Sequence, residues 1–187
     1  METCRLAEYL AYSVPIIFVA GLMYAVSQNH WFSFTHNALS DMGSLHNPRG
    51  YIFNDVIKIT AIAGFGAAGL FMMKGHAYLL PFAMISLFLV GVFPEEMKWH
   101  GPSAVLFYLL ALLDILVVGL KMYADGSSVG VLWAIVGVLT LVTIILMARY
   151  RWPVKGLAVP ELIGAAVILS WVVYLGTLQC GGPAVTH

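Results

Sequence analysis

The sequence predicts an all-α, polytopic membrane protein built as a six-transmembrane-helix bundle. Hydrophobic residues make up 61% of the 187 residues, and charged residues only 10%. A soluble domain carries about 25% charged residues, so this chain lacks the polar surface that a water-soluble protein needs. Its apolar runs approach the roughly 20 residues that a membrane span requires. We therefore expect a single integral membrane domain over residues 1–187, in the plasma membrane.

The expected spans cover residues 6–27, 51–73, 78–93, 102–122, 129–148 and 157–178. The first is interpreted as a span and not as a signal peptide, because its apolar run is long and AVSQ at 25–28 is a poor cleavage site. The third stops at Pro94, and the fourth begins at Pro102, since proline suits the first turn of a helix. A turn at residues 125–128 (DGSS) separates the fourth span from the fifth.

Six spans place both termini on one side of the membrane and loops one, three and five on the other side, which we call the loop face. The loop face carries five basic residues, Arg49, Lys98, Arg149, Arg151 and Lys155, and the opposite side carries three, Arg5, Lys74 and Lys121. Lys and Arg are enriched in cytoplasmic loops. This margin favours the loop face as the cytoplasmic one only slightly, so the orientation stays open.

Polar residues concentrate near the loop face, in residues 31–55 and 93–103. Spans two, four and six all begin at this face, and each helical residue adds roughly 1.5 Å of depth. Lys58 and Glu161 therefore lie at comparable depth, close to the loops. The prediction is a polar pocket at the face of loops one and three.

Titratable side chains in this pocket predict acid–base chemistry, which requires a proton donor and acceptor close together with access to water. The candidate catalytic residues are Asp41, Glu96 and His100, and the last two meet if one helix covers both. Ser40 and Asp41 have a structural alternative, in which they begin a helix or turn by accepting backbone N–H groups, with a left-handed Gly43 beside them. The candidate substrate-binding residues are Asn37, Ser40, Asn54, Asp55, Lys58 and Glu161.

Ionisable residues inside apolar spans cost roughly 3 kcal/mol and usually face the bundle interior or pair. We therefore expect Lys58 to face the interior and to pair with Asp55 or Glu161. Asp114 lies roughly 18 Å below the start of its span, where it is either a proton or cation relay or a neutral acid bonded across helices. Its candidate partners are a tyrosine hydroxyl, Ser86, Thr140 and Thr143.

A divalent metal is a further hypothesis for the pocket, because imidazole and carboxylate groups are suitable ligands. The candidate metal ligands are His36, His46 and Glu95, although the chain lacks the HExxH spacing and each single histidine is more typical of a solvated loop or an interface. The two cysteines, Cys4 and Cys180, lie near opposite ends of the chain. They are interpreted as inert thiols, with a disulfide between the termini as the alternative.

Three motifs in order resemble those of a known family. They are NALSDMG at residues 37–43, Phe53-Asn54 at the start of a span, and GVFPE at residues 91–95 followed by His100. Their combination resembles the small prokaryotic membrane proteins of the domain of unknown function 998 family, over roughly the first two-thirds of the chain. The resemblance implies a six-span bundle and no established reaction. It also implies that the residues to test are Asn37, Ser40, Asp41, Gly43, Asn54, Pro94 and His100.

Three functions stay open from the sequence. The first is an enzyme that binds or processes a lipid or another membrane-borne substrate by acid–base or metal-assisted chemistry at the loop face. The second is a small transporter or a channel for ions or protons that uses Lys58, Asp114 and Glu161, although the chain shows no clear internal repeat. The third is a non-catalytic membrane subunit or partner-binding module. The expected partners are the lipid bilayer and either further copies of the chain or another membrane protein. A net charge of zero without a basic run argues against nucleic acid.

Overall fold

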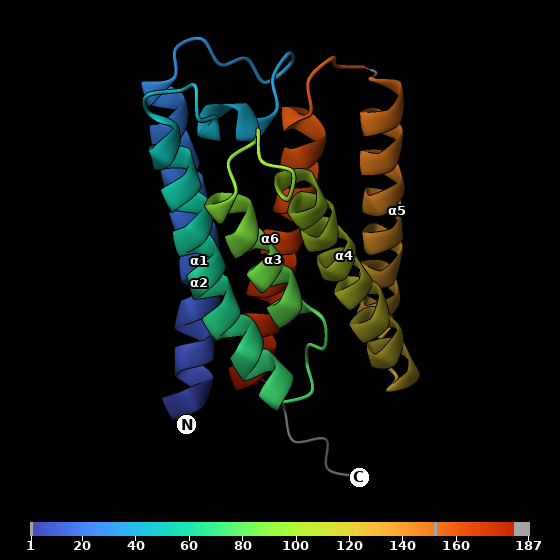
Figure 1. Ribbon diagram of the computed structural model, residues 1–187. Helices are drawn as coiled ribbons and strands as arrows, with labels where there is room; N and C mark the ends of the chain where they lie inside the picture. The colour runs from blue at the N-terminus through green and yellow to red at the C-terminus, as the bar shows by residue number, and fades with distance from the viewer. Residues whose placement is uncertain (1, 152, 182–187) are drawn as a thin grey trace.

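The computed structural model describes residues 2–151 and 153–181, apart from the side chains of residues 179–181. Within these residues the chain forms six α-helices and a short 3₁₀ helix, and no strand (Figure 1). In chain order the elements are α1 (Glu2–Gln28), η1 (Leu39–Gly43), α2 (Gly50–Met73), α3 (Leu80–Val92), α4 (His100–Ala124), α5 (Ser128–Tyr150) and α6 (Ala158–Gly181). The predicted all-α bundle is confirmed.

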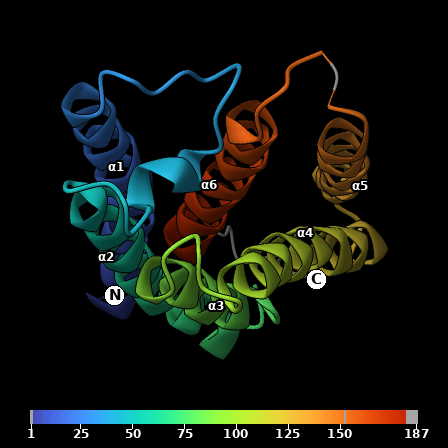
Figure 2. The same cartoon turned by 45° about the horizontal axis from the view of Figure 1, so that its top comes forward.

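The six helices pack in a closed ring. Each helix from α1 to α5 packs against the next one, and α6 packs against both α1 and α5. Figure 2 shows this ring from the end that carries η1, with η1 lying between α2 and α6. The start of α1 and the end of α6 lie at the opposite end, so loops one, three and five share one face as expected (Figure 1). This face is the loop face defined above.

Five of the helices, α1, α2, α4, α5 and α6, are long and apolar enough to cross a membrane. The protein is therefore an integral membrane protein. The exception is α3, whose 13 residues rise roughly 20 Å against a hydrocarbon core of roughly 30 Å. The apolar helix expected over residues 78–93 is present with narrower bounds.

The linker between α2 and α3 explains the short helix. Residues 74–79 turn back into the bundle, where Ala77 is fully buried and Pro81 stands in the first turn of α3. The backbone N–H groups of Tyr78, Leu79 and Leu80 all point at the side chain of Asp114 on α4. Irregular backbone inside a membrane must find partners within the protein, and this carboxyl group supplies them.

The start of α4 also differs from the prediction. The helix begins at His100, two residues before the expected Pro102, because turns from Pro94 to Met97 and from Met97 to His100 lead directly into it. Proline is tolerated at the third helical position since the first four N–H groups of a helix have no partner within it. His100 therefore belongs to the rigid helix and not to the loop.

The interpretation of two inert thiols does not hold for Cys4, which is not a free thiol. The side chain of Cys180 lies outside the described residues.

Candidate functional site

Loop one folds over the end of the bundle as a cap, and Asp41 holds the start of η1. One oxygen of its carboxyl group accepts hydrogen bonds from the backbone N–H of Ala38 (3.1 Å) and from the amide of Asn37 (2.8 Å). These contacts agree with the expected structural role of Asp41 in starting a helix or turn. A catalytic role for Asp41 stays a prediction.

Gly43 does not have the left-handed backbone that the sequence suggested. The residues with positive φ in the described ranges are Gly75, Gly126 and Arg151. A Cβ atom on Gly43 would instead collide with the side-chain oxygen of Asn54 and lie 3.0 Å from the ring of Phe53. Asn54 in turn donates a hydrogen bond to the carbonyl oxygen of Gly43 (2.9 Å). The absent side chain therefore lets η1 sit directly on the first turn of α2.

Loop one is also fastened to the start of α6. The backbone N–H of Ala158 donates to the carbonyl oxygen of Asn37 (2.9 Å), and that of Gly156 donates to Thr35 (2.9 Å). On the first turn of α6, the carboxylate of Glu161 accepts the backbone N–H of Leu39 at 2.7 Å. The cap and Glu161 are therefore positioned by one another.

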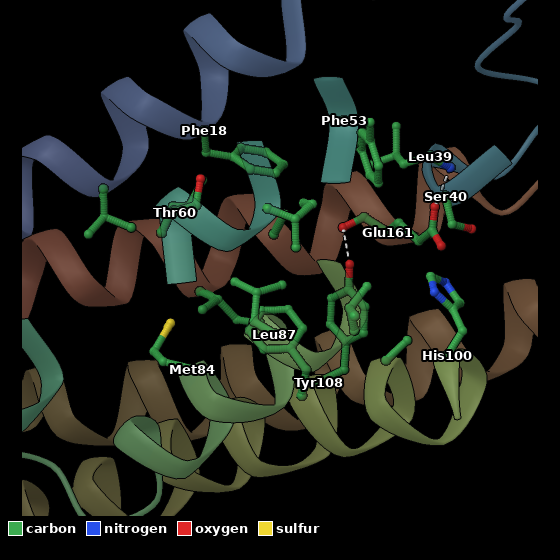
Figure 3. A pocket seen from close by; sticks show the side chains of 18 residues that line it. Phe18, Leu39, Ser40, Phe53, Thr60, Met84, Leu87, His100, Tyr108 and Glu161 are labelled. Carbon is green, nitrogen blue, oxygen red and sulfur yellow. Dashed lines mark hydrogen bonds between the residues drawn. The ribbon is translucent and has the colours of Figure 1, made fainter. Parts of the chain in front are cut away.

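A cavity lies beneath this cap, inside the ring of helices (Figure 3). It contains about 680 Å³ of space not filled by protein atoms, its mouth included. Each helix that lines it contributes one stripe at helical spacing, such as Phe53, Ile57 and Thr60 on α2. The rest of the lining is Val14 and Phe18; Leu39 and Ser40; Met84, Leu87 and Val90; His100, Ala104, Phe107 and Tyr108; and Glu161, Ala165, Ile168 and Leu169. The walls are thus apolar along most of their length.

The end of the cavity nearest the loop face is polar, formed by Ser40, His100 and Glu161. Figure 3 shows the imidazole of His100 facing the carboxyl group of Glu161, with Ser40 beside them. Within the described residues, three atoms here have no hydrogen-bond partner: the Ser40 hydroxyl, Nε2 of His100 and the Glu161 oxygen that does not contact Leu39. This end of the cavity therefore has hydrogen-bonding capacity that the protein itself does not use.

The hydrogen bond of Nδ1 determines the tautomer of His100. Nδ1 lies 2.7 Å from the carbonyl oxygen of Phe93, and because a carbonyl group only accepts, Nδ1 must carry the proton. In the neutral ring Nε2 is then unprotonated, so it can accept a proton from a molecule in the cavity. The side chain is 8% exposed, which holds the ring in this orientation.

Two polar residues of the cavity, Tyr108 and Thr60, were missed by the sequence reasoning. The Tyr108 hydroxyl donates to the main-chain oxygen of Glu161 (2.9 Å), and it ties α4 to α6 beside the site. Thr60 lies deeper, and its buried hydroxyl has no partner within the described chain. The available signal was helical spacing: Tyr108 follows His100 by eight residues, and Thr60 follows Phe53 by seven, which places each pair on one side of its helix.

Glu95 and Glu96 are adjacent in the loop between α3 and α4, and their surroundings shift their pKa values in opposite directions. Partial burial, followed by the negative charge of Asp41 and a hydrogen bond with it, raises the pKa of Glu95 to about 7. Glu96 instead accepts hydrogen bonds from the hydroxyl of Ser44 and the N–H of Leu45, which lower its pKa to about 2. Glu96 is therefore bound to loop one, and the expected pairing of Glu96 with His100 is wrong.

Lys58 pairs with Asp55 at 2.7 Å, as one of the two expected alternatives. The two side chains are 33% and 52% exposed, so the expectation that Lys58 faces the bundle interior is wrong, and Glu161 is not its partner. The position on the helix explains this, because Lys58 is one residue, or roughly 100°, beyond the cavity-lining Ile57. The aliphatic part of the Lys58 side chain lies against Gly91 of α3.

Asp114 is fully buried on α4 and accepts four hydrogen bonds. Three come from backbone N–H groups at the start of α3, at 2.7, 2.7 and 3.2 Å, and the fourth from the indole N–H of Trp171 on α6, at 3.2 Å. The expected partners Ser86, Thr140, Thr143 and a tyrosine hydroxyl are not the partners found. Every bond is donated to the carboxyl group, as an ionised carboxylate accepts, and the relay function stays a prediction.

The structure does not bring the candidate metal ligands together. His36 contacts the hydroxyl of Thr35 (2.8 Å) within its own turn, and His46 lies by Glu96, whereas Glu95 lies by Asp41. In the part of the chain that the structure describes, no group of three or more His, Cys, Asp or Glu side chains is arranged to hold a metal ion.

Comparison with known proteins gives one match. The family model described as Protein of unknown function (DUF998) matches residues 13–178. No curated protein and no solved structure matches the chain. The match confirms the resemblance seen in the motifs, and it extends that resemblance into α5 and α6.

Proposed function

We propose that this chain, which belongs to the DUF998 family, binds a single-chain amphiphile between its helices and acts on the polar end of that molecule by acid–base chemistry. The observation that carries the proposal is the cavity, which is apolar along most of its length, with Ser40, His100 and Glu161 gathered at the end nearest the loop face. The plasma membrane, favoured by the resemblance to small prokaryotic membrane proteins, is the proposed location and the source of the amphiphile.

The shape of the cavity supports the binding of one hydrocarbon chain. Its walls are apolar and its few polar groups lie together at one end, which is the combination found in typical ligand sites. The small side chains of Ala104 and Ala165 leave room between α4 and α6. A chain bound here would place the group attached to it beside Ser40, His100 and Glu161.

The polar end supports acid–base chemistry by His100. Its unprotonated Nε2 would take a proton from a water molecule as the water oxygen bonds to an acyl carbon of the ligand, and would return that proton to the oxygen or nitrogen atom whose bond to the acyl carbon breaks. The Nδ1–H bond to Phe93 fixes the ring, and the carboxyl group of Glu161 faces it. Ser40 is placed to hold the reacting group.

The transport alternative receives no support from the geometry. Lys58 is paired with Asp55 near the outside of the bundle, and Asp114 is enclosed by four hydrogen-bond donors. Glu161 lies apart from both, under the cap. A second copy or another membrane protein as partner stays a prediction.

The test is conversion of a membrane lipid by the reconstituted protein. Liposomes made from a total bacterial lipid extract would be incubated with the wild type, His100→Gln or His30→Gln, and the lipids compared by mass spectrometry. His30 is an exposed loop residue near the same face and serves as the matched control. We expect one lipid species to fall and a product to rise with the wild type and His30→Gln only. Equal conversion by His100→Gln would reject the acid–base role. Absence of any product with the wild type would leave a non-catalytic binding module.

A further inference from the structure

We infer that the polar end of the bound amphiphile is a hydrogen-bond donor without negative charge, an amine or a hydroxyl group, and not a phosphate or a carboxylate. This inference rests on the proposed function, because it assigns the head group of the molecule whose chain fills the cavity. It depends on which charges and which unpaired atoms lie at the cavity's polar end.

Negative charge predominates at that end. Glu161 lines the cavity itself, and Asp41 and Glu95 lie close enough to act on it electrostatically. The hydrogen bond between Glu95 and Asp41 links this group to the surface of the loop face. An anionic head group placed here would face the carboxylate of Glu161 with Asp41 nearby, and like charges at short range disfavour binding.

Basic side chains that would offset this charge are directed elsewhere. Among the residues that the structure describes, no lysine or arginine lines the cavity. On the loop face, Lys58 pairs with Asp55, Arg49 donates to Gln28, and Lys98 lies 5.4 Å from the centre of the Trp99 ring. Proteins bind phosphate and carboxylate head groups through arginine, lysine or clustered N–H groups, and this site presents none of the first two.

The unpaired atoms at the site are mainly acceptors. The second oxygen of Glu161 and Nε2 of His100 both accept hydrogen bonds, and the Ser40 hydroxyl can accept as well as donate. An ammonium group offers three donors, which matches these three atoms, and its charge is complementary to Glu161. A hydroxyl group offers one donor, so it satisfies the site less completely.

A head-group series with one chain length tests this directly. The protein in neutral phosphatidylcholine nanodiscs would be titrated with dodecylamine, dodecanol, dodecanoate and dodecyl phosphate. Bound ligand would be counted by native mass spectrometry, with empty nanodiscs giving the background partitioning. We expect the amine to bind about tenfold more tightly than the alcohol, as a charge-assisted hydrogen bond exceeds a neutral one by roughly 1.4 kcal/mol. The two anions should show no saturable binding.

Substitutions of single acids test which residue causes the preference for the amine. Glu161→Gln should lower the affinity for the amine to that for the alcohol and leave the alcohol unchanged. Asp125→Asn, which alters an exposed acid at the end of α4 away from the loop face, should change neither. If Glu161→Gln does not fold, the binding of the four ligands to the wild type is sufficient to test the inference. Tightest binding of the carboxylate or phosphate would overturn the inference. Equal saturable binding of all four would also overturn it but leave the proposed function standing. Absence of saturable binding by any of the four would reject the proposed function itself.

Discussion

Glu161 and Asp114 are both single acids on apolar helices, yet their surroundings differ completely. Asp114 is 0% exposed and accepts four hydrogen bonds from α3 and α6. Glu161 accepts one, from Leu39, and its other oxygen faces the cavity beside His100. Asp114 thus resembles a helix cap supplied from a neighbouring helix, whereas Glu161 keeps a free acceptor for a ligand.

The difference shows how to separate structural from functional acids in a membrane bundle. A buried carboxylate is costly unless its hydrogen-bonding capacity is used. Where backbone N–H groups use it, the residue holds the fold together. Where the capacity is left open toward a cavity, it is available to a bound molecule. Each prediction below tests one side of this contrast.

The largest expected effect is that of Asp114→Ala on stability. Four buried donors would lose their acceptor, and each costs roughly 1–3 kcal/mol when unpaired, so we expect a loss of more than about 3 kcal/mol in the free energy of unfolding. The measurement is denaturant unfolding in mild detergent. The same measurement on Glu161→Gln should show a loss below about 1 kcal/mol, because glutamine can still accept from Leu39. Similar losses in the free energy of unfolding for the two variants would contradict the contrast between Asp114 and Glu161.

Gly43→Ala should have the next largest effect, at the cap above Glu161. The added Cβ would collide with Asn54, and overpacking of this kind costs about 1–3 kcal/mol. Gly101→Ala is the control, because a Cβ at Gly101 meets nothing within 4 Å. Thermal unfolding of the two variants should differ by several degrees. A Gly43→Ala protein as stable as the wild type would show that the cap does not depend on this close contact.

Glu95 predicts a pH dependence at the loop face. Its pKa is raised from 4.5 to about 7, so the folded state holds this proton more tightly than the unfolded state does. Its contribution to stability is therefore full below pH 4.5 and is lost as the pH rises toward 7. For Glu96, whose pKa is lowered to about 2, the contribution is present above pH 4.5 and lost as the pH falls.

Thermal unfolding between pH 4 and 8 checks this prediction. Glu95→Gln should flatten the decline in melting temperature between pH 4.5 and 7, whereas Glu96→Gln should leave that decline in place. An unchanged profile for Glu95→Gln would mean that the contact between Glu95 and Asp41 does not control the proton.

Thr60→Val should have the smallest effect. The substitution keeps the shape of the side chain and removes a buried hydroxyl that has no partner within the described chain. Removing an unpaired polar group should leave stability unchanged or raise it by up to about 1 kcal/mol. A clear destabilisation in denaturant unfolding would show that the hydroxyl has a partner, such as an ordered water molecule.

Much of the fold could be predicted from the sequence, because long apolar runs in a membrane can only form helices, and their number fixes which loops share a face. The short α3 and its contact with Asp114 could not. The polar side chains of neighbouring spans were the only partners for Asp114 that the sequence suggested, whereas its main partners are backbone N–H groups of a linker that turns back into the bundle.

The candidate site was predictable only in outline. Ser40, His100 and Glu161 were among the candidates, but periodicity alone does not show which polar residue of a helix faces a cavity. Lys58 lies one residue from the cavity stripe and points outward. Glu95 and Glu96 lie in an irregular turn, where one residue of difference places one acid at Asp41 and the other at Ser44. Such turns carry no periodic signal.

The most direct test of the central claim is whether a membrane amphiphile occupies the cavity. Wild type, Ala165→Phe and Ala166→Phe would be purified from membranes in mild detergent, and the lipids retained by each quantified by mass spectrometry. Ala165 lines the cavity, whereas its neighbour Ala166 is exposed and lies roughly 100° further round α6, so the two variants add the same ring inside and outside the cavity. Ala104→Leu, a smaller change in the same wall, replaces Ala165→Phe if that variant does not fold.

We predict that wild type and Ala166→Phe retain one single-chain amphiphile per protein and that the cavity-filling variant loses it. Equal retention by the cavity-filling variant and the wild type would contradict the account.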